Sequence, residues 1–139
     1  MKNILITYQS RTGITKKYAE EIAAYLKTKI PGTTVLSVKE CNNELISKAD
    51  LILLGCWTNG LMIFLQHPDK VWKNFAKGLP SVKDKKVGLF ATYKLATGSM
   101  FKKMKVHLSA KTSDIAVELK SKRGNLSDND KSLLDQIID

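Results

Sequence analysis

The sequence predicts an α/β domain in which five parallel strands form one doubly wound sheet. Segments typical of strands alternate five times with segments that carry a helical pattern. Right-handed crossovers between such strands place helices on both faces of the sheet. The chain of 139 residues is long enough for a sizeable core and shows no internal repeat or linker. We therefore expect residues 1–139 to form a single domain.

The first half of the chain contains three predicted strands. An apolar run predicts a buried strand at Met1–Tyr8, and apolar residues at helical spacing predict a helix over Gly13–Lys29. After a Pro-Gly turn, the alternating, β-branched segment Thr33–Val38 predicts the second strand. Cys41–Lys48 is interpreted as a short helix or a loop. The continuous apolar run in Asp50–Gly55 predicts a third strand that is covered on both faces.

The second half contains two strands and three helices. Pro68–Lys77 has proline at its start and Gly-Leu-Pro after its end, a pair of signals that brackets a helix. A fourth strand at Lys86–Thr92 is followed by a helix at Ser99–Leu108, which places three apolar residues on one face. The fifth strand is predicted at Asp114–Leu119. A serine with an aspartate three residues later marks the start of the last helix, Asp128–Ile138.

Three loops follow predicted strands at their carboxyl ends. They comprise residues 9–15, 56–66 and 93–98. Open parallel sheets bind ligands outside the carboxyl ends of their strands, so we expect these loops to surround a ligand. The irregular segment Cys56–Gln66 is long for a connection, and long loops of this kind are often functional.

The first loop has the composition of an anion site. It carries the hydroxyls of Ser10, Thr12 and Thr15 together with Gly13. The first amides of the following helix have no intrahelical partner, and the helix dipole adds partial positive charge to them. A phosphate suits such a place best. The alternative is an ordinary strand-to-helix loop that Ser or Thr caps, and spacing alone does not separate the two interpretations.

These residues resemble the phosphate signature of the flavodoxin family. The positions that match are Tyr8, Ser10, Gly13, Thr15 and Ala19, whereas Thr7 stands where the family usually has an aliphatic or aromatic residue. The resemblance covers essentially the whole chain and implies a three-layer, flavodoxin-like fold with strand order 2-1-3-4-5. It also implies that flavin mononucleotide (FMN) binds without a covalent link. The phosphate would lie on Ser10, Arg11, Thr12, Gly13, Ile14 and Thr15.

The resemblance assigns the flavin ring to the other two loops. The second loop matches the family segment beside the isoalloxazine through Cys56, Trp57, Thr58, Asn59 and Gly60. We expect Trp57 to stack on the ring, because a flat indole gives a large contact area and excludes water. Trp72 lies within a predicted helix and is the better candidate for the core. Cys56 is interpreted as a small buried filler rather than a reactive thiol.

The third loop begins where the fourth strand ends. Backbone groups of Thr92, Tyr93 and Lys94 are expected to contact the pyrimidine edge of the flavin. Tyr93 is either a second neighbour of the ring or a residue that simply ends the strand. The Gly-x-Gly-Asp pattern common in flavodoxins at this place is missing.

The charge of the chain is unevenly distributed. The net charge is +10, and residues 70–123 hold 14 Lys and Arg against 3 Asp and Glu. A solvated basic face is one interpretation, and a docking surface for an acidic partner is the other. The second interpretation implies a partner with an acidic docking face. This is the reverse of the usual polarity, because flavodoxins as a family tend to be acidic.

The function predicted from these features is FMN-dependent electron transfer between protein redox partners. An enzyme on the same fold is the alternative, namely a flavin-dependent reductase or oxidase of a quinone, porphyrinogen or related substrate. A nucleic-acid-binding module has only the charge in its favour, because an aromatic content of 7% supplies no stacking array. No apolar run approaches the ~20 residues of a membrane span. Two cysteines without metal spacing indicate reduced thiols in a cytoplasmic protein.

Overall fold

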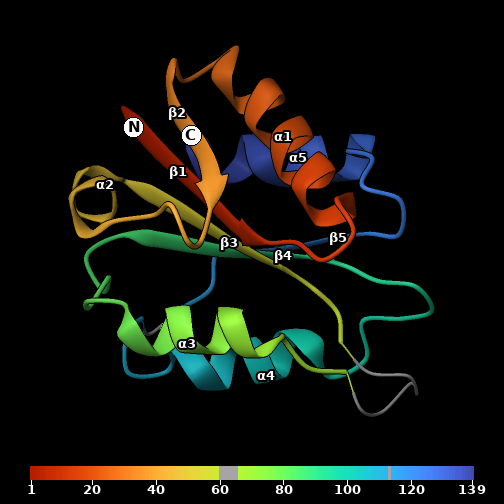
Figure 1. Cartoon of the computed structure of the whole chain (residues 1–139). Coiled ribbons are helices and arrows are strands. Elements are labelled where there is room, and N and C mark those ends of the chain that lie inside the picture. The colour runs from red at the N-terminus through yellow and green to blue at the C-terminus, as the bar shows by residue number, and fades with distance from the viewer. Residues whose placement is uncertain (60–65, 113) are drawn as a thin grey trace.

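The computed structural model describes residues 1–59, 66–112 and 114–139 (Figure 1). It confirms one parallel, five-stranded sheet with the order β2-β1-β3-β4-β5. The strands are β1 (Asn3–Gln9), β2 (Gly32–Ser37), β3 (Leu51–Trp57), β4 (Lys86–Thr92) and β5 (Val117–Ser121). One helix follows each strand: α1 (Ile14–Lys27), α2 (Asn43–Lys48), α3 (Lys70–Gly78), α4 (Met100–Leu108) and α5 (Asp128–Ile138).

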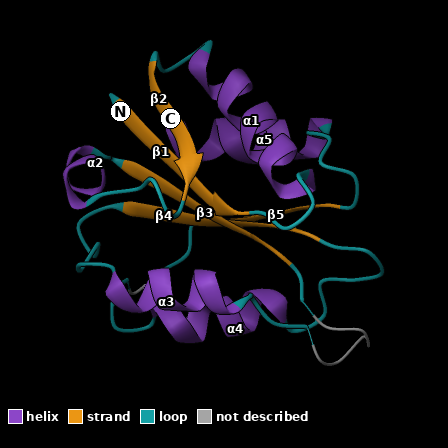
Figure 2. Cartoon of the chain, in the orientation of Figure 1, coloured by secondary structure: helices purple, strands orange, loops and turns teal. Residues whose placement is uncertain are grey.

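The helices cover both faces of the sheet, which confirms the predicted three layers. Helices α1 and α5 lie on one face and α3 and α4 on the other (Figure 2). Each interface has its own cluster of buried residues, with Tyr18 and Phe90 on the α1 side and Met104 on the α3 side. Trp72 is fully buried in the α3 cluster, so its predicted place in the core is confirmed.

An aromatic contact fixes the start of α1 over the sheet. The rings of Tyr18 and Phe90 meet edge to face, with their centroids 5.9 Å apart. Gly55 leaves the space that Phe90 fills, since a Cβ at Gly55 would lie 2.0 Å from the Phe90 ring. The Tyr18 hydroxyl also donates a hydrogen bond to Asp130 of α5, at 2.8 Å. The turn that precedes α1 is therefore held in a definite place relative to β3 and β4.

Strand β3 is longer than the sequence indicates. Cys56 and Trp57 belong to this strand rather than to the irregular segment predicted over residues 56–66. The reason is the parallel ladder, because Ala91 and Thr92 of β4 stand opposite these two residues in register. The strand consequently delivers the Trp57 side chain at its very end.

Strand β5 and helix α3 both begin later than predicted. Pairing between β4 and β5 starts at Gly88 and Val117, so β5 begins three residues after Asp114. Helix α3 begins at Lys70 rather than at Pro68, because the side chain of Asp69 caps it. The start of β5 depends on pairing with β4, which is distant in sequence. The start of α3 depends on a capping residue that the local pattern does not single out.

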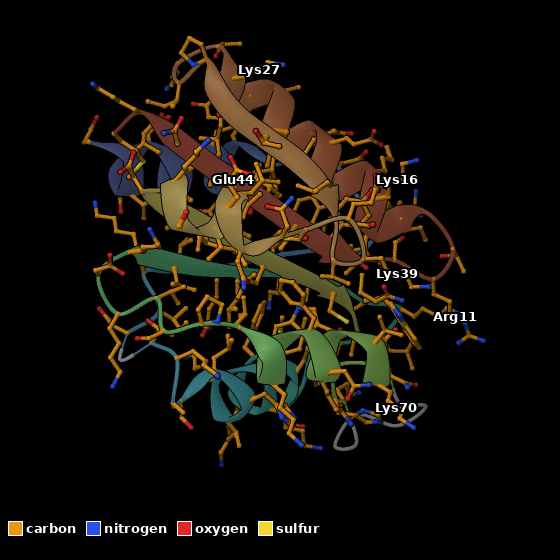
Figure 3. All side chains as sticks on the ribbon, turned by 60° about the vertical axis from the view of Figure 1, so that its left-hand side comes forward. Arg11, Lys16, Lys27, Lys39, Glu44 and Lys70 are labelled. Carbon is orange, nitrogen blue, oxygen red and sulfur yellow. The ribbon has the colours of Figure 1, made fainter. Side chains whose placement is uncertain are left out.

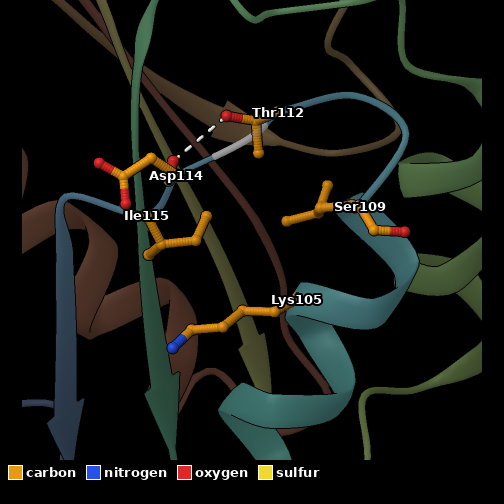
Figure 4. A pocket seen from close by; sticks show the side chains of 6 residues that line it. Lys105, Ser109, Thr112, Asp114 and Ile115 are labelled. Atoms are coloured by element: carbon orange, nitrogen blue, oxygen red, sulfur yellow. Dashed lines mark hydrogen bonds between the residues drawn. The ribbon is translucent and has the colours of Figure 1, made fainter.

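Two described cavities lie at the edge of the sheet where the strands begin. One, of about 330 Å³, lies between the end of α4 and the segment that enters β5 (Figure 4); it is lined by Lys105, Leu108, Ser109, Thr112, Asp114 and Ile115. The other, of about 440 Å³, lies beside Asp50 and Lys86 at the starts of β3 and β4. Both are therefore remote from the three loops at the carboxyl ends.

Within the described ranges, none of the helices has the length and apolar character that crossing a membrane requires.

Candidate functional site

The turn between β1 and α1 is organised by the hydroxyl of Ser10. Its Oγ accepts hydrogen bonds from the backbone N–H groups of Gly13 at 3.1 Å and of Lys16 at 3.3 Å. Gly13 has a φ of 92°, a left-handed conformation that glycine adopts without steric cost. Ser10 therefore caps the turn in the way that the alternative interpretation of this loop expects.

Three amides of the same turn are available to a ligand. Among the described residues, no acceptor contacts the backbone N–H groups of Thr12, Ile14 or Thr15. Thr12 and Ile14 are exposed. Amides of this kind at a helix start attract an anion, because each carries an unused donor and the helix dipole points the same way. The serine cap therefore leaves three amides of this turn without an acceptor among the described residues.

Thr15 connects this turn to the end of β4. Its Oγ1 lies 2.6 Å from Oγ1 of Thr92, and the side chains are 1% and 4% exposed. The carbonyl of Thr92 accepts a hydrogen bond from the N–H of Thr58 at 2.8 Å. One residue at the end of β4 therefore links all three loops, and the sequence alone does not indicate this role for its side chain.

Trp57 is held between the first loop and α3. Its Nε1–H donates to Oδ2 of Asp69 at 2.8 Å, while Oδ1 of Asp69 accepts from the N–H of Trp72. The Arg11 guanidinium lies over the indole, 5.1 Å from the ring centroid, as in a cation–π contact. Stacking of Trp57 on a flavin stays a prediction. Sequence reasoning missed Asp69, although an acidic residue beside the predicted helix start is a signal that finds it.

A short bridge closes the base of the second loop. Asn59 and His67 exchange two backbone hydrogen bonds of 3.0 Å each in an antiparallel pair. The predicted contact of Gly60 lies outside the described residues. Close to this base, the hydroxyl of Thr58 is buried without a hydrogen-bond partner among the described residues. A polar group left in this state is costly unless a ligand or water completes it.

The third loop leaves the sheet at Tyr93. The Tyr93 N–H donates to the carbonyl of Ser121 in β5 at 3.2 Å, and its side chain is half-buried. Lys94 is exposed, and the next residue, Leu95, is 74% exposed. Apolar and basic side chains therefore face solvent directly beside the point where the three loops meet.

Cys56 faces the core rather than the loops. Its side chain is fully buried in the cluster between the sheet and the α3 layer. Burial raises the pKa of the Cys56 thiol far above its usual value, so the group stays protonated and unreactive. The interpretation as a buried filler is confirmed, and any contact of Cys56 with a flavin would involve its backbone.

Basic side chains line the edge at the carboxyl ends of the strands. Figure 3 shows Arg11, Lys16, Lys39 and Lys70 along the same side of the molecule, although they come from four different segments. Such a rim raises the local concentration of anions and steers negatively charged partners toward the loops.

The comparisons with known proteins agree with this geometry. A family model described as "Flavodoxin domain" matches residues 5–120, which is most of the chain. The chain belongs to the flavodoxin domain family. A flavodoxin from Megasphaera elsdenii is 38% identical to this flavodoxin domain over 96 residues, or 67% of the chain. The match spans 66% of that relative's length, slightly less than two thirds.

Solved structures support the same family. The solution structure of two-electron reduced Megasphaera elsdenii flavodoxin superposes on this flavodoxin domain with a TM-score of 0.72 and 25% identity, covering 94% of each chain. Oxidised flavodoxin 2 from Bacillus cereus gives a TM-score of 0.70 at 19% identity, covering 97% of this chain and 94% of that one. The second likeness shows the fold alone.

Proposed function

We propose that this flavodoxin domain binds FMN and carries electrons between protein redox partners. The turn Ser10–Thr15 carries the proposal, because it combines a buried threonine hydroxyl with three helix-start amides that have no acceptor among the described residues. Family membership and the strand order support it. FMN supplies the redox chemistry when it is bound, and the protein positions it, excludes water and presents it to partners.

The described residues fit such a cofactor. The amides of Thr12, Ile14 and Thr15 would hold the phosphate, together with the other residues of the turn. At the ring, Trp57 offers an aromatic surface, and the unpartnered hydroxyl of Thr58 offers a donor that the protein alone does not use. Asn59, Gly60 and the backbone of Thr92, Tyr93 and Lys94 complete the proposed set. No side chain of this set needs to act as a general acid or base.

The charge distribution supports an acidic partner. Helices α3 and α4 carry Lys70, Lys73, Lys77, Lys102, Lys103 and Lys105 and no acidic residue. We call these six lysines and Lys94 of the third loop the basic surface. Helices α1 and α5 on the opposite face carry four Lys against five Asp and Glu. The proposed partner is a redox protein with an acidic docking face, in a cytoplasmic setting that reduced thiols suit.

The alternative of a flavin-dependent enzyme has less support. Both described cavities lie at the edge where the strands begin, away from the three loops. Neither of these two cavities places a quinone or porphyrinogen beside the proposed flavin site. An electron carrier needs only an exposed edge of the cofactor, which the exposed third loop is suited to border.

Titration with two flavins tests the proposal. The cofactor-free protein should bind FMN much more tightly than riboflavin, since only FMN carries the phosphate that the first turn recognises. Flavin fluorescence and a visible absorption spectrum of the complex measure both affinities. Equal affinity for riboflavin and FMN, or no binding of either, would contradict the assignment of the turn.

A further inference from the structure

The hydrogen bond between Thr15 and Thr92 joins two buried hydroxyls that are 77 residues apart in the chain. We propose that Thr92 is a positioning residue for the phosphate: it donates its hydroxyl proton to Thr15, and Thr15 then donates its own proton to the phosphate. The inference rests on the proposed function, because it concerns how the same turn recognises FMN. It assigns to Thr92 a side-chain role that acts only through Thr15.

The proton count of the pair carries the first step. Each hydroxyl has one proton, and the 2.6 Å contact uses one of the two. Among the described residues, neither hydroxyl makes another hydrogen bond to a side chain or to the backbone. One proton of the pair therefore has no acceptor within the described protein. Either of the two threonines can hold this spare proton.

The position of the pair decides which hydroxyl should keep the spare proton. Thr15 is the second residue of α1, beside the unpartnered amides of Thr12 and Ile14. Thr92 is the last residue of β4, and its hydroxyl contacts that of Thr15. An anion at the turn attracts the spare proton toward itself, and a hydroxyl bonded to an ionised acceptor gives a stronger hydrogen bond than a neutral pair. The favoured chain therefore runs from Thr92 to Thr15 to the anion.

Thr92 is well placed to hold this direction. Its carbonyl accepts from Thr58 N–H, and it pairs in register with Trp57 of β3 and Ser121 of β5. A residue paired on both sides in the sheet cannot shift without disturbing its neighbours. The Thr15 hydroxyl thus has a partner that is held in a fixed place. A hydroxyl whose partner is already in place loses less freedom when it binds a ligand, which reduces the ordering cost of binding.

Selectivity between two flavins gives the readout. Thr92→Val removes the hydroxyl at nearly constant volume, so the Thr15 oxygen loses its donor and its orientation. FMN affinity should fall about tenfold, the effect of losing one net hydrogen bond, whereas riboflavin affinity should stay within about twofold because riboflavin has no phosphate. Thr92→Ser keeps the hydroxyl and should restore the FMN-to-riboflavin ratio. A merely structural role would move both affinities together.

Matched variants separate this role from the general loss of a buried hydroxyl. Thr33→Val removes a buried hydroxyl that donates to the Ile30 carbonyl at the far edge of the sheet, and it should leave the ratio unchanged. Thr15→Val should lower FMN affinity by about ten- to a hundredfold. The double variant Thr15→Val with Thr92→Val should bind FMN no more weakly than Thr15→Val alone, because both residues act through one bond.

A measurement on the wild-type protein makes the test independent of how the variants fold. In the FMN complex, nuclear magnetic resonance should detect coupling across the hydrogen bond between the Thr15 hydroxyl proton and the phosphate phosphorus. Coupling of the Thr92 proton in its place would overturn the inference, as would a Thr92→Val variant that folds and keeps the wild-type ratio. In both cases the wild-type preference for FMN would survive, so the proposed function would stand. A wild-type protein without that preference would overturn both.

Discussion

The Trp57 side chain is held in place by residues from other segments of the chain. Its indole is fixed by a hydrogen bond to Asp69 and covered by the guanidinium of Arg11. The family resemblance predicts Trp57 as a residue of the site, because the segment that contains it matches the family segment beside the flavin ring. Neither contact follows from the local pattern, since each partner belongs to another segment of the chain.

Fluorescence of the two tryptophans tests the predicted stacking of Trp57 on the flavin. FMN binding should quench the tryptophan emission, because an excited indole that contacts the flavin ring passes its excitation energy to the ring. Trp57→Phe leaves Trp72 as the single emitter and should remove most of the quenching. It should also weaken FMN binding, since Phe offers a smaller surface. If quenching persists unchanged in Trp57→Phe, Trp72 is the reporter and Trp57 does not stack.

The residues of the first turn show where sequence reasoning succeeds. Hydroxyls and a glycine at a strand-to-helix junction predict unpartnered amides there, and the structure has them at Thr12, Ile14 and Thr15. The spacing does not tell that Ser10 is used by the turn itself, or that Thr15 meets Thr92. Such pairings depend on how α1 lies on the sheet, which only the packed core defines.

At the level of elements, the caps were partly predictable. The serine and aspartate at the start of α5 form a capping box, in which Asp130 also accepts from the N–H of Ser127. This confirms a prediction made from two residues three apart. The start of α3 differs, because Asp69 both caps the helix and accepts from the Trp57 indole. A side chain with two acceptor oxygens serves two elements there, and a one-dimensional pattern shows only one of them.

The packing of α1 against α5 gives a stability prediction. Tyr18→Phe removes the hydrogen bond from the buried hydroxyl to Asp130, and we expect the free energy of unfolding to fall by ~1.5–3 kcal/mol because the acceptor is a carboxylate. Urea unfolding of the cofactor-free protein measures it. Tyr25→Phe is the control, as its bond to Asp135 is only partly buried and Lys29 also contacts that carboxylate. A Tyr18→Phe loss no larger than that of Tyr25→Phe would contradict the expectation.

The same tyrosine makes stability depend on pH at the alkaline end. Burial, and then the hydrogen bond and charge of Asp130, raise the pKa of Tyr18 far above its usual value of 10.0. The folded state therefore keeps the proton that the unfolded chain loses above pH 10, so stability should fall as pH rises beyond that value. Between pH 8 and pH 11, the unfolding free energy of wild type should therefore approach that of Tyr18→Phe. The difference between the two proteins should shrink by at most ~1.4 kcal/mol per pH unit. Parallel profiles would contradict this origin.

For the whole molecule, alternation of strand and helix predicts a doubly wound parallel sheet. Continuous apolar runs such as the one in β3 require cover on both faces, and the family resemblance supplies the strand order that the structure confirms. The arrangement also brings the ends of β1, β3 and β4 together, so the meeting of the three loops follows from topology. Their internal conformations do not, because they depend on contacts between side chains such as Arg11 and Trp57.

Charge is the property of the whole molecule that most directly concerns partners. The basic surface covers one face and reaches the third loop, whereas the helices on the opposite face are nearly balanced in charge. Among the described residues, no ion pair neutralises Lys94, Lys102 or Lys103. The interaction energy between two unit charges ~10 Å apart is about 0.4 kcal/mol in water and smaller in salt. Several lysines must therefore act together to change the reduction potential or the binding of a partner.

Reversal of Lys94, Lys102 and Lys103 to Glu tests the basic surface. Negative charge near the cofactor disfavours the anionic, fully reduced flavin, so the reduction potential should become more negative than that of wild type. Electron transfer with an acidic partner should also slow and lose its dependence on salt, because attraction no longer guides the encounter. Redox titration and stopped-flow kinetics at two ionic strengths measure the two effects.

The control reverses Lys2, Lys27 and Lys83 to Glu. These lysines are exposed near the starts of the strands, and their reversal changes the net charge equally. If both triple variants behave alike, net charge alone is responsible; if neither changes potential or salt dependence, the basic surface takes no part in electron transfer.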